Sequence, residues 1–154
     1  MDVDHRQRVE AAYRDQADRM WRALFGYTGD RDVARDALAE AFARALQNEA
    51  VIRDLPAWLW RVSFRLASAE LKHRGRMRQA LEPPGYEMPD PLPELMAALN
   101  QLSPKQRLAL VLHDYADRPT DEVAQTIGCS RATVHVHLSN GRRRLRTLLE
   151  EDHA

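Results

Sequence analysis

The sequence is poor in cysteine, in aromatic residues and in net charge, and each shortage excludes a class of protein. Cys129 is the only cysteine in 154 residues, so no internal disulfide can form. Aromatic residues make up 6%, whereas alanine, leucine and arginine are abundant, and this composition favours helices. With 23 basic and 23 acidic residues the formal net charge is zero, so the molecule as a whole is not a general polyanion binder.

Long apolar runs are missing as well. The N-terminus is polar and charged, and no apolar stretch is long enough to span a bilayer. We therefore expect a cytoplasmic protein with no membrane insertion.

The groupings that catalysis needs are also absent. Glu122 and the pair His113-Asp114 are titratable, but no nucleophile–base pair or phosphate-binding glycine loop accompanies them. His135 and His137 are two residues apart, so on a helix they point about 200° from one another and cannot share a metal ion. We expect no enzyme activity, no cofactor and no metal.

Proline is concentrated in one place. Five of the eight prolines fall between Ala80 and Pro93, a stretch that cannot be helical and that predicts an extended, acidic linker. The sequence therefore predicts an all-α protein of two small helical domains. Their expected bounds are 1–78 and 94–154, with the linker at 79–93.

Three- and four-residue spacing of apolar residues predicts the helices of the first domain. The first helix is expected to bury one apolar stripe and to end at Thr28-Gly29-Asp30, and the second carries a face of small residues. Residues 47–55 read as a loop, and Asp54 and Pro56 begin a third helix. The expected buried positions are Val9, Tyr13, Ala17, Met20, Trp21 and Leu24, then Val33, Ala34, Ala37, Leu38, Ala41, Phe42 and Ala45, then Leu59, Val62 and Leu66. Trp58 and Trp60 cannot both lie on the last stripe.

The second domain has the local pattern of a helix-turn-helix. Ser103-Pro104-Lys105-Gln106 forms a capping box with proline at the first helical position. Thr120 is expected to cap the next helix, Gly128 to end it in a left-handed conformation, and Ser130 to cap the last one. The first of these helices is expected to bury Leu108, Val111, Leu112 and Tyr115.

The last helix is the candidate recognition helix, the one that would lie in the major groove. Val134, Leu138, Gly141, Leu145 and Leu148 form its core stripe, and Gly141 indicates close approach to a neighbouring helix. The polar residues off that stripe are the candidate DNA contacts: Arg131, Thr133, His135, His137, Asn140, Arg142 and Arg144.

The two halves together resemble the extracytoplasmic-function, or group IV, sigma factors of bacterial RNA polymerase. In the first half the resemblance rests on residues 27–42 (YTGDRDVARDALAEAF) and 56–62 (PAWLWRV). In the second half it rests on residues 102–107 (LSPKQR), 121–124 (DEVA) and 132–134 (ATV). The similarity covers nearly the whole chain, including the position of the linker.

The resemblance implies a protein that binds core RNA polymerase and directs promoter-specific initiation of transcription. The first domain would bind the polymerase clamp and open the −10 element, and the second would bind the −35 element. An anti-sigma factor is the expected partner in the resting state. The implied polymerase contacts are Asp36 and Glu40, and the implied −10 contacts are Gln47, Asn48, Trp58, Arg61, Arg65, Lys72 and Arg74.

Several positions depart from the family pattern. Ala39 replaces a usual glutamine, Arg65 a usual asparagine, and Ala69 or Glu70 a usual aspartate. His135, His137 and Asn140 stand where lysine or arginine is usual, which reduces the number of phosphate contacts. These departures predict atypical promoter elements.

Two alternatives stay open from the sequence. A LuxR-type regulator is suggested by residues 133–140 (TVHVHLSN), although the first half lacks the strand–helix alternation of a receiver domain. A sigma-like interaction protein would bind polymerase or a regulator without initiating transcription, as the altered melting helix suggests.

Overall fold

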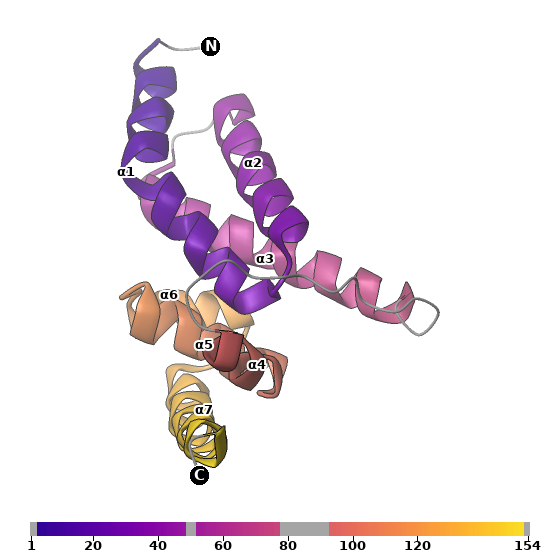
Figure 1. The fold of residues 1–154 in the computed structure, drawn as a ribbon. Helices are drawn as coiled ribbons and strands as arrows, with labels where there is room; N and C mark the ends of the chain where they lie inside the picture. The colour runs from indigo at the N-terminus through magenta and orange to yellow at the C-terminus, as the bar shows by residue number, and fades with distance from the viewer. Residues whose placement is uncertain (1–2, 49–51, 78–92, 153–154) are drawn as a thin grey trace.

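The computed structural model describes residues 3–48, 52–77 and 93–152, and in these ranges every regular element is a helix. The first half contains α1 (Val3–Thr28), α2 (Arg31–Gln47) and α3 (Leu55–Met77). The second half contains α4 (Pro93–Asn100), α5 (Pro104–Leu110), the π-helical turn η1 (Val111–Tyr115), α6 (Thr120–Ile127) and α7 (Arg131–Asp152). Figure 1 shows α1, α2 and α3 together at one end of the molecule and α7 at the other.

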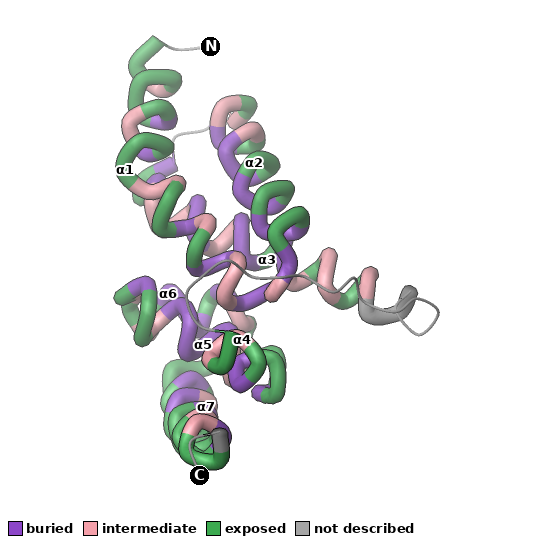
Figure 2. Tube along the Cα trace, viewed as in Figure 1, coloured by how far each residue is buried: buried purple, intermediate pink, exposed green. Residues whose placement is uncertain are grey.

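The first three helices pack around a shared core, and their buried sides face one another in Figure 2. The small-residue face predicted for α2 is confirmed, since all seven of its predicted positions are buried. Tyr13, predicted to be buried, is instead 54% exposed and lies edge-on to Phe42, with ring centroids 5.1 Å apart.

The predicted buried stripe of α3 is partly wrong. Leu59 is fully buried, but Val62 and Leu66 are only half-buried. The core side is instead formed by Trp60, Phe64 and Ala67. Trp60 stacks on Phe64 with ring centroids 6.0 Å apart, and its indole N–H donates to Gln16 Oε1 at 3.2 Å. The helix is rotated toward the large aromatic side chains because they bury more apolar surface than valine or leucine.

Most of the predicted helix caps are present. The Ser103–Gln106 capping box forms, Ser130 Oγ accepts from the backbone N–H of Thr133 at 3.1 Å, and Gly128 is left-handed with φ of 85°. The cap predicted at Thr120 is wrong, because Thr120 is already the first residue of α6 and follows Pro119, which offers no side-chain cap.

The helix that begins at Pro104 widens into the π-helical turn η1. The backbone N–H of Ala116 donates to the carbonyl of Val111 at 3.0 Å, five residues back, and the chain then turns through Asp117 with φ of 55°. Leu108, Val111 and Leu112 are buried as predicted, but Tyr115 is 49% exposed because the wider turn changes the direction in which it projects.

Gly141 lies where α7 meets α5, as its position on the core stripe predicts. A Cβ atom there would come within 3.2 Å of Leu110 Cδ1 and 3.3 Å of Gln106 Cβ. These separations are shorter than ordinary contacts between carbon atoms, so glycine lets the two helix backbones approach closely.

The two halves of the protein pack against each other, which the sequence does not predict. The Arg107 guanidinium lies 5.4 Å from the centre of the Tyr27 ring, and burial lowers the pKa of Arg107. Arg19 Nη2 donates to Asp117 Oδ2 at 2.9 Å. The predicted linker cannot be compared, since residues 78–92 lie outside the described ranges. Pro93, assigned to the linker from the sequence, is instead the first residue of α4.

Candidate nucleic-acid interfaces

The outward side of α7 is the first candidate surface. Its predicted core stripe is confirmed: Val134, Leu138, Gly141 and Leu148 are buried, and Leu145 is partly buried. Six of the seven predicted DNA contacts are exposed, and His137 is half-exposed. The predicted residues therefore lie on the accessible part of the helix.

Three of these seven side chains already have partners within the protein. Arg131 pairs with Asp121 at 3.2 Å, and Thr133 Oγ1 lies 2.9 Å from Ser130 Oγ. Arg142 forms a two-pronged pair with Asp114, at 2.8 Å and 2.5 Å, and this hydrogen bond raises the pKa of Arg142. The remaining four, which make no hydrogen bond or ion pair to any described residue, are His135, His137, Asn140 and Arg144.

The outermost row of α7 was missed by the sequence interpretation. It lies opposite the core stripe and follows from counting 100° per residue around the helix. Its members are spaced by four, three and four positions and are all exposed: Ala132, Val136, Ser139 and Arg143. The sequence interpretation considered only polar residues as DNA contacts, and two members of this row are apolar.

The second candidate surface lies at the start of α3. Trp58 is half-buried and lines a small cavity of about 480 Å³. The same cavity is lined by Asn48 and Arg61, so the structure brings together three of the seven residues predicted to contact the −10 element. Gln125, from α6, also lines it. Gln47 is exposed at the end of α2.

Helix α6 binds the two arginines of this surface, of which Arg61 is partly buried and Arg65 is exposed. Arg65 Nη2 donates to the backbone carbonyl of Gln125 at 2.5 Å, and Arg61 Nη1 donates to Gln125 Oε1 at 3.3 Å. Two cations predicted to contact the −10 strand are therefore bound to the helix-turn-helix.

An ion pair near the start of α6 adds a second contact between α6 and α3. Arg118 binds Glu122 through two hydrogen bonds, one of them 2.6 Å from Nη2 to Oε1, and the hydrogen bond raises the pKa of Arg118. The Arg118 guanidinium also lies 5.5 Å from the centre of the Trp60 ring. Trp60 belongs to α3, so one arginine side chain links α6 to the core of the first half.

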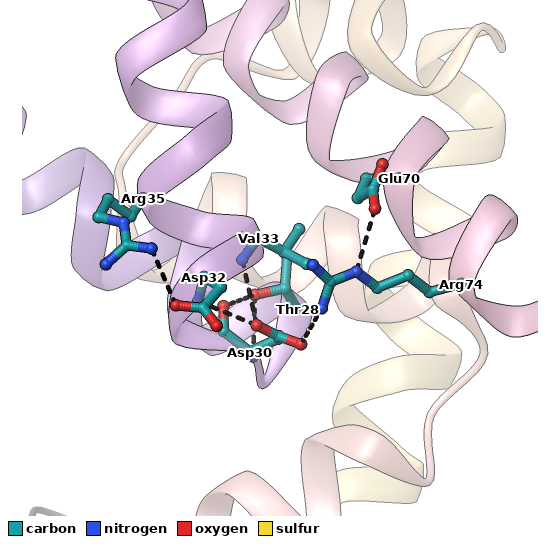
Figure 3. A network of polar contacts seen from close by, with 7 residues as sticks. All are labelled: Thr28, Asp30, Asp32, Val33, Arg35, Glu70 and Arg74. Atoms are coloured by element: carbon teal, nitrogen blue, oxygen red, sulfur yellow. Dashed lines mark hydrogen bonds and ion pairs between the residues drawn. The ribbon is translucent and has the colours of Figure 1, made fainter. Parts of the chain in front are cut away.

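The far part of α3 holds Lys72 and Arg74, which the resemblance assigns to the displaced strand. Lys72 is exposed. Arg74 donates from Nη1 to Asp30 Oδ2 at 2.8 Å and from Nε to Glu70 Oε1 at 3.0 Å, as Figure 3 shows. The hydrogen bond to Glu70 raises the pKa of Arg74.

Asp30 uses its second oxygen to cap α2. Oδ1 accepts from the backbone N–H groups of Asp32 at 2.9 Å and Val33 at 3.1 Å (Figure 3). The carboxylate is buried, so it joins the start of α2 to the far part of α3. In this structure Arg74 is therefore an anchor for α3.

The candidate polymerase contacts lie on the outer side of α2. Asp36 and Glu40 are both exposed and one helical turn apart, with the exposed Ala39 beside them. Glu40 Oε1 accepts from Arg44 at 2.9 Å, whereas the Arg35–Asp36 separation is 3.8 Å. Exposed pairs of this kind hold side chains weakly, so both carboxylates are available to a basic partner.

A larger groove, of about 1170 Å³, lies between the two halves. It draws its lining from α1, the first residue of α2, α4, α5, η1 and α7, and most of that lining is apolar. Four arginines also line it: Arg22, Arg31, Arg142 and Arg146. The sequence interpretation missed this groove because it exists only where the halves pack together.

Within the described ranges, no group of three or more histidine, cysteine, aspartate or glutamate residues is arranged to hold a metal ion. None of the described helices is long and apolar enough to cross a membrane.

Comparisons with known proteins agree with the helix-turn-helix assignment. A model of the family "Sigma-70, region 4" matches residues 92–145. Among solved structures, a complex of the sigma factor RpoE with the anti-sigma factor NepR from Bartonella quintana has a similar fold, with a TM-score of 0.70. It covers 97% of this chain and 98% of that chain at 24% identity. The sigma factor SigJ of Mycobacterium tuberculosis has a TM-score of 0.62 at 29% identity, over 82% and 50% of the two chains.

Curated relatives extend the similarity to most of the chain. The ECF sigma factor SigE of Mycolicibacterium smegmatis is 30% identical over 88% of this chain and 59% of its own length, so the chain spans little more than half of that protein. SigL of Mycobacterium tuberculosis is 30% identical over 93% of this chain and 89% of its own length. The chain therefore belongs to the ECF RNA polymerase sigma factors.

Proposed function

We propose that this protein binds core RNA polymerase and directs promoter-specific initiation of transcription in the cytoplasm, as a two-domain factor. The observation that supports this most strongly is the match to SigL along almost the entire chain, on a fold that carries an exposed recognition helix. Family membership replaces the LuxR-type alternative. The polymerase would carry out the chemistry.

The two candidate surfaces divide the promoter between them. The α7 surface, residues 131–144, binds the −35 element as a duplex, because a recognition helix fits the major groove. The α3 surface, which comprises Asn48, Trp58, Arg61 and Arg65, binds the −10 element. Its cavity suits one unstacked base, and its arginines suit the backbone of a single strand.

The two arginines of the α3 surface must be released from α6 before they can bind DNA. In the packed arrangement Arg61 and Arg65 are bound to Gln125, so a DNA strand would compete with α6 for the same guanidinium groups. Binding to polymerase would supply the free energy that separates the halves, since it would hold each domain at a fixed position on the enzyme.

Asp36 and Glu40 would form part of the contact with core polymerase. They are exposed on the side of α2 that faces away from the protein core. Charge reversal of both carboxylates to lysine should abolish binding to a basic polymerase surface, whereas reversal of Glu10, exposed on α1, should not. Co-purification with core polymerase measures the difference.

An anti-sigma factor is the partner we expect in the resting state. Solved complexes of RpoE with NepR and of CnrH with the cytosolic domain of CnrY have folds similar to this chain. The groove between the halves suits an amphipathic segment that is mainly apolar, because its lining is mostly apolar and its charged residues are of both signs, four arginines together with Asp114 and Glu150. An anti-sigma segment bound in the groove would hold the two halves together and would keep the α3 arginines bound to Gln125.

The decisive experiment is reconstitution with core polymerase on a library of genomic fragments. Transcripts that start at defined sites and require this protein are the expected result. Core binding without transcripts from any fragment would instead favour a sigma-like interaction protein. This is the second candidate because Arg61 and Arg65 are bound to Gln125 rather than free to contact DNA. Absence of core binding would contradict both.

A further inference from the structure

The outermost row of α7 contains an apolar side chain that no contact within the protein explains. Val136 is 55% exposed in the middle of a 22-residue helix. Valine is a poorer helix former than alanine, and an exposed valine gains nothing from packing. Ala132, one turn before it, is also exposed, so the front of the first two turns is apolar.

The polar side chains around this apolar strip are partly engaged elsewhere. Arg131 is bound to Asp121, and the Thr133 hydroxyl lies within hydrogen-bond distance of Ser130. His135 and Asn140 remain open on the two flanks of Val136, and Ser139 and Arg143 follow it in the same row. The first two turns of the row therefore present carbon atoms, and its polar side chains lie at the later turns and on the flanks.

The major groove has one apolar feature that such a front can recognise. Thymine carries a C5-methyl group, which small apolar side chains contact and which distinguishes it from cytosine. We propose that Val136 determines specificity by packing on the methyl group of one thymine in the −35 element. This inference rests on the proposed function of the α7 surface.

Uracil substitution tests the contact directly. After −35 sequences have been selected from random duplexes with the reconstituted holoenzyme, each thymine in the element is replaced singly by uracil, which removes only the methyl group. At one position we expect the affinity to fall about 3- to 6-fold, the effect of one buried methyl group. In the Val136→Ala holoenzyme, the difference between thymine and uracil at that position should be smaller, because alanine reaches less far toward the methyl group.

Val3 supplies a matched control. It is an exposed valine, 69% accessible, at the start of α1, and lies outside both candidate surfaces. Val3→Ala should keep the full difference between thymine and uracil. The inference is overturned if the selected element contains no thymine, if no uracil substitution weakens binding, or if Val136→Ala keeps the full difference. A holoenzyme that shows no −35 preference would instead contradict the function proposed for α7.

Discussion

The two candidate DNA surfaces differ in what their side chains contact: both arginines of the α3 surface are bound to a helix of the other half, whereas the partners on the α7 surface come from its own half. Arg61 and Arg65 are both bound to Gln125, whereas Asn140 and Arg144 make no polar contact with any described residue. The surface with the bound arginines is the one proposed to bind a single strand, which exists only after the duplex has opened. A single strand would therefore compete with Gln125 for these two guanidinium groups.

Breaking the Arg118–Glu122 ion pair, which lies beside the contact between α6 and α3, should give the largest effect on stability. Glu122→Ala leaves the Arg118 guanidinium, 19% exposed, between α6 and Trp60 without its carboxylate. We expect the free energy of unfolding to fall by about 3 kcal/mol, because breaking a buried ion pair leaves a charge uncompensated. Urea denaturation followed by circular dichroism measures it. Glu10→Ala breaks an exposed pair and should cost less than about 0.5 kcal/mol. Equal costs would mean that Arg118 has no supporting role.

A positive charge at position 125 should separate α6 from the α3 arginines without changing any residue of α3. Gln125→Arg places a cation beside Arg61 and Arg65, so repulsion replaces the hydrogen bond to Arg61. We expect a larger radius of gyration in X-ray scattering and about 5-fold tighter binding of a single-stranded −10 oligonucleotide, with −35 duplex binding unchanged. Gln7→Arg adds the same charge at an exposed site on α1 and serves as the control. Unchanged scattering would show that α6 does not hold the halves together.

Substitutions of two neighbouring cations on α3 should have different effects, because one cation anchors the helix and the other is proposed to contact DNA. Arg74→Ala removes the bonds to Asp30 and Glu70 and should lower the free energy of unfolding by about 1 kcal/mol, allowing for the partial exposure of the arginine. Lys72→Ala should leave stability unchanged. It should lower the slope of log affinity against log salt concentration by about 0.7 for single-strand binding, which is the value for one phosphate contact. Identical effects of the two substitutions would remove the distinction.

The smallest effects are expected on the open α7 surface. Arg144→Ala should reduce the salt-dependence slope of −35 duplex binding by about 0.9, because it removes one phosphate contact. Arg142→Ala should change that slope less, since its guanidinium is bound to Asp114 on both prongs. Filter binding at several salt concentrations gives both slopes. A larger loss for Arg142→Ala would show that its pair with Asp114 opens on DNA.

The elements that were predictable are those set by local signals. The capping box at Ser103, the left-handed Gly128 and the cap at Ser130 act over three or four residues, so the helix-turn-helix follows from its own sequence. The face of α3 was harder to predict, because it depends on how Trp60 and Phe64 fit against α1 and α2.

The contact between the halves could not be predicted. Arg61 and Gln125 are 64 positions apart, and neither carries a local sign of its partner. The same is true of Arg107 over Tyr27 and of the groove. The sequence indicates which residues are candidates for binding nucleic acid, but their partners within the protein depend on packing between the two halves.

Gly141 has a consequence for how the protein meets DNA. The missing side chain lets α7 lie against Gln106 and Leu110, so residue 141 sets how closely α7 packs on α5. A helix held closer to the body enters the major groove less deeply. A larger side chain at residue 141 would push α7 away from α5 and so change the depth of groove entry, although no DNA-facing residue would be replaced.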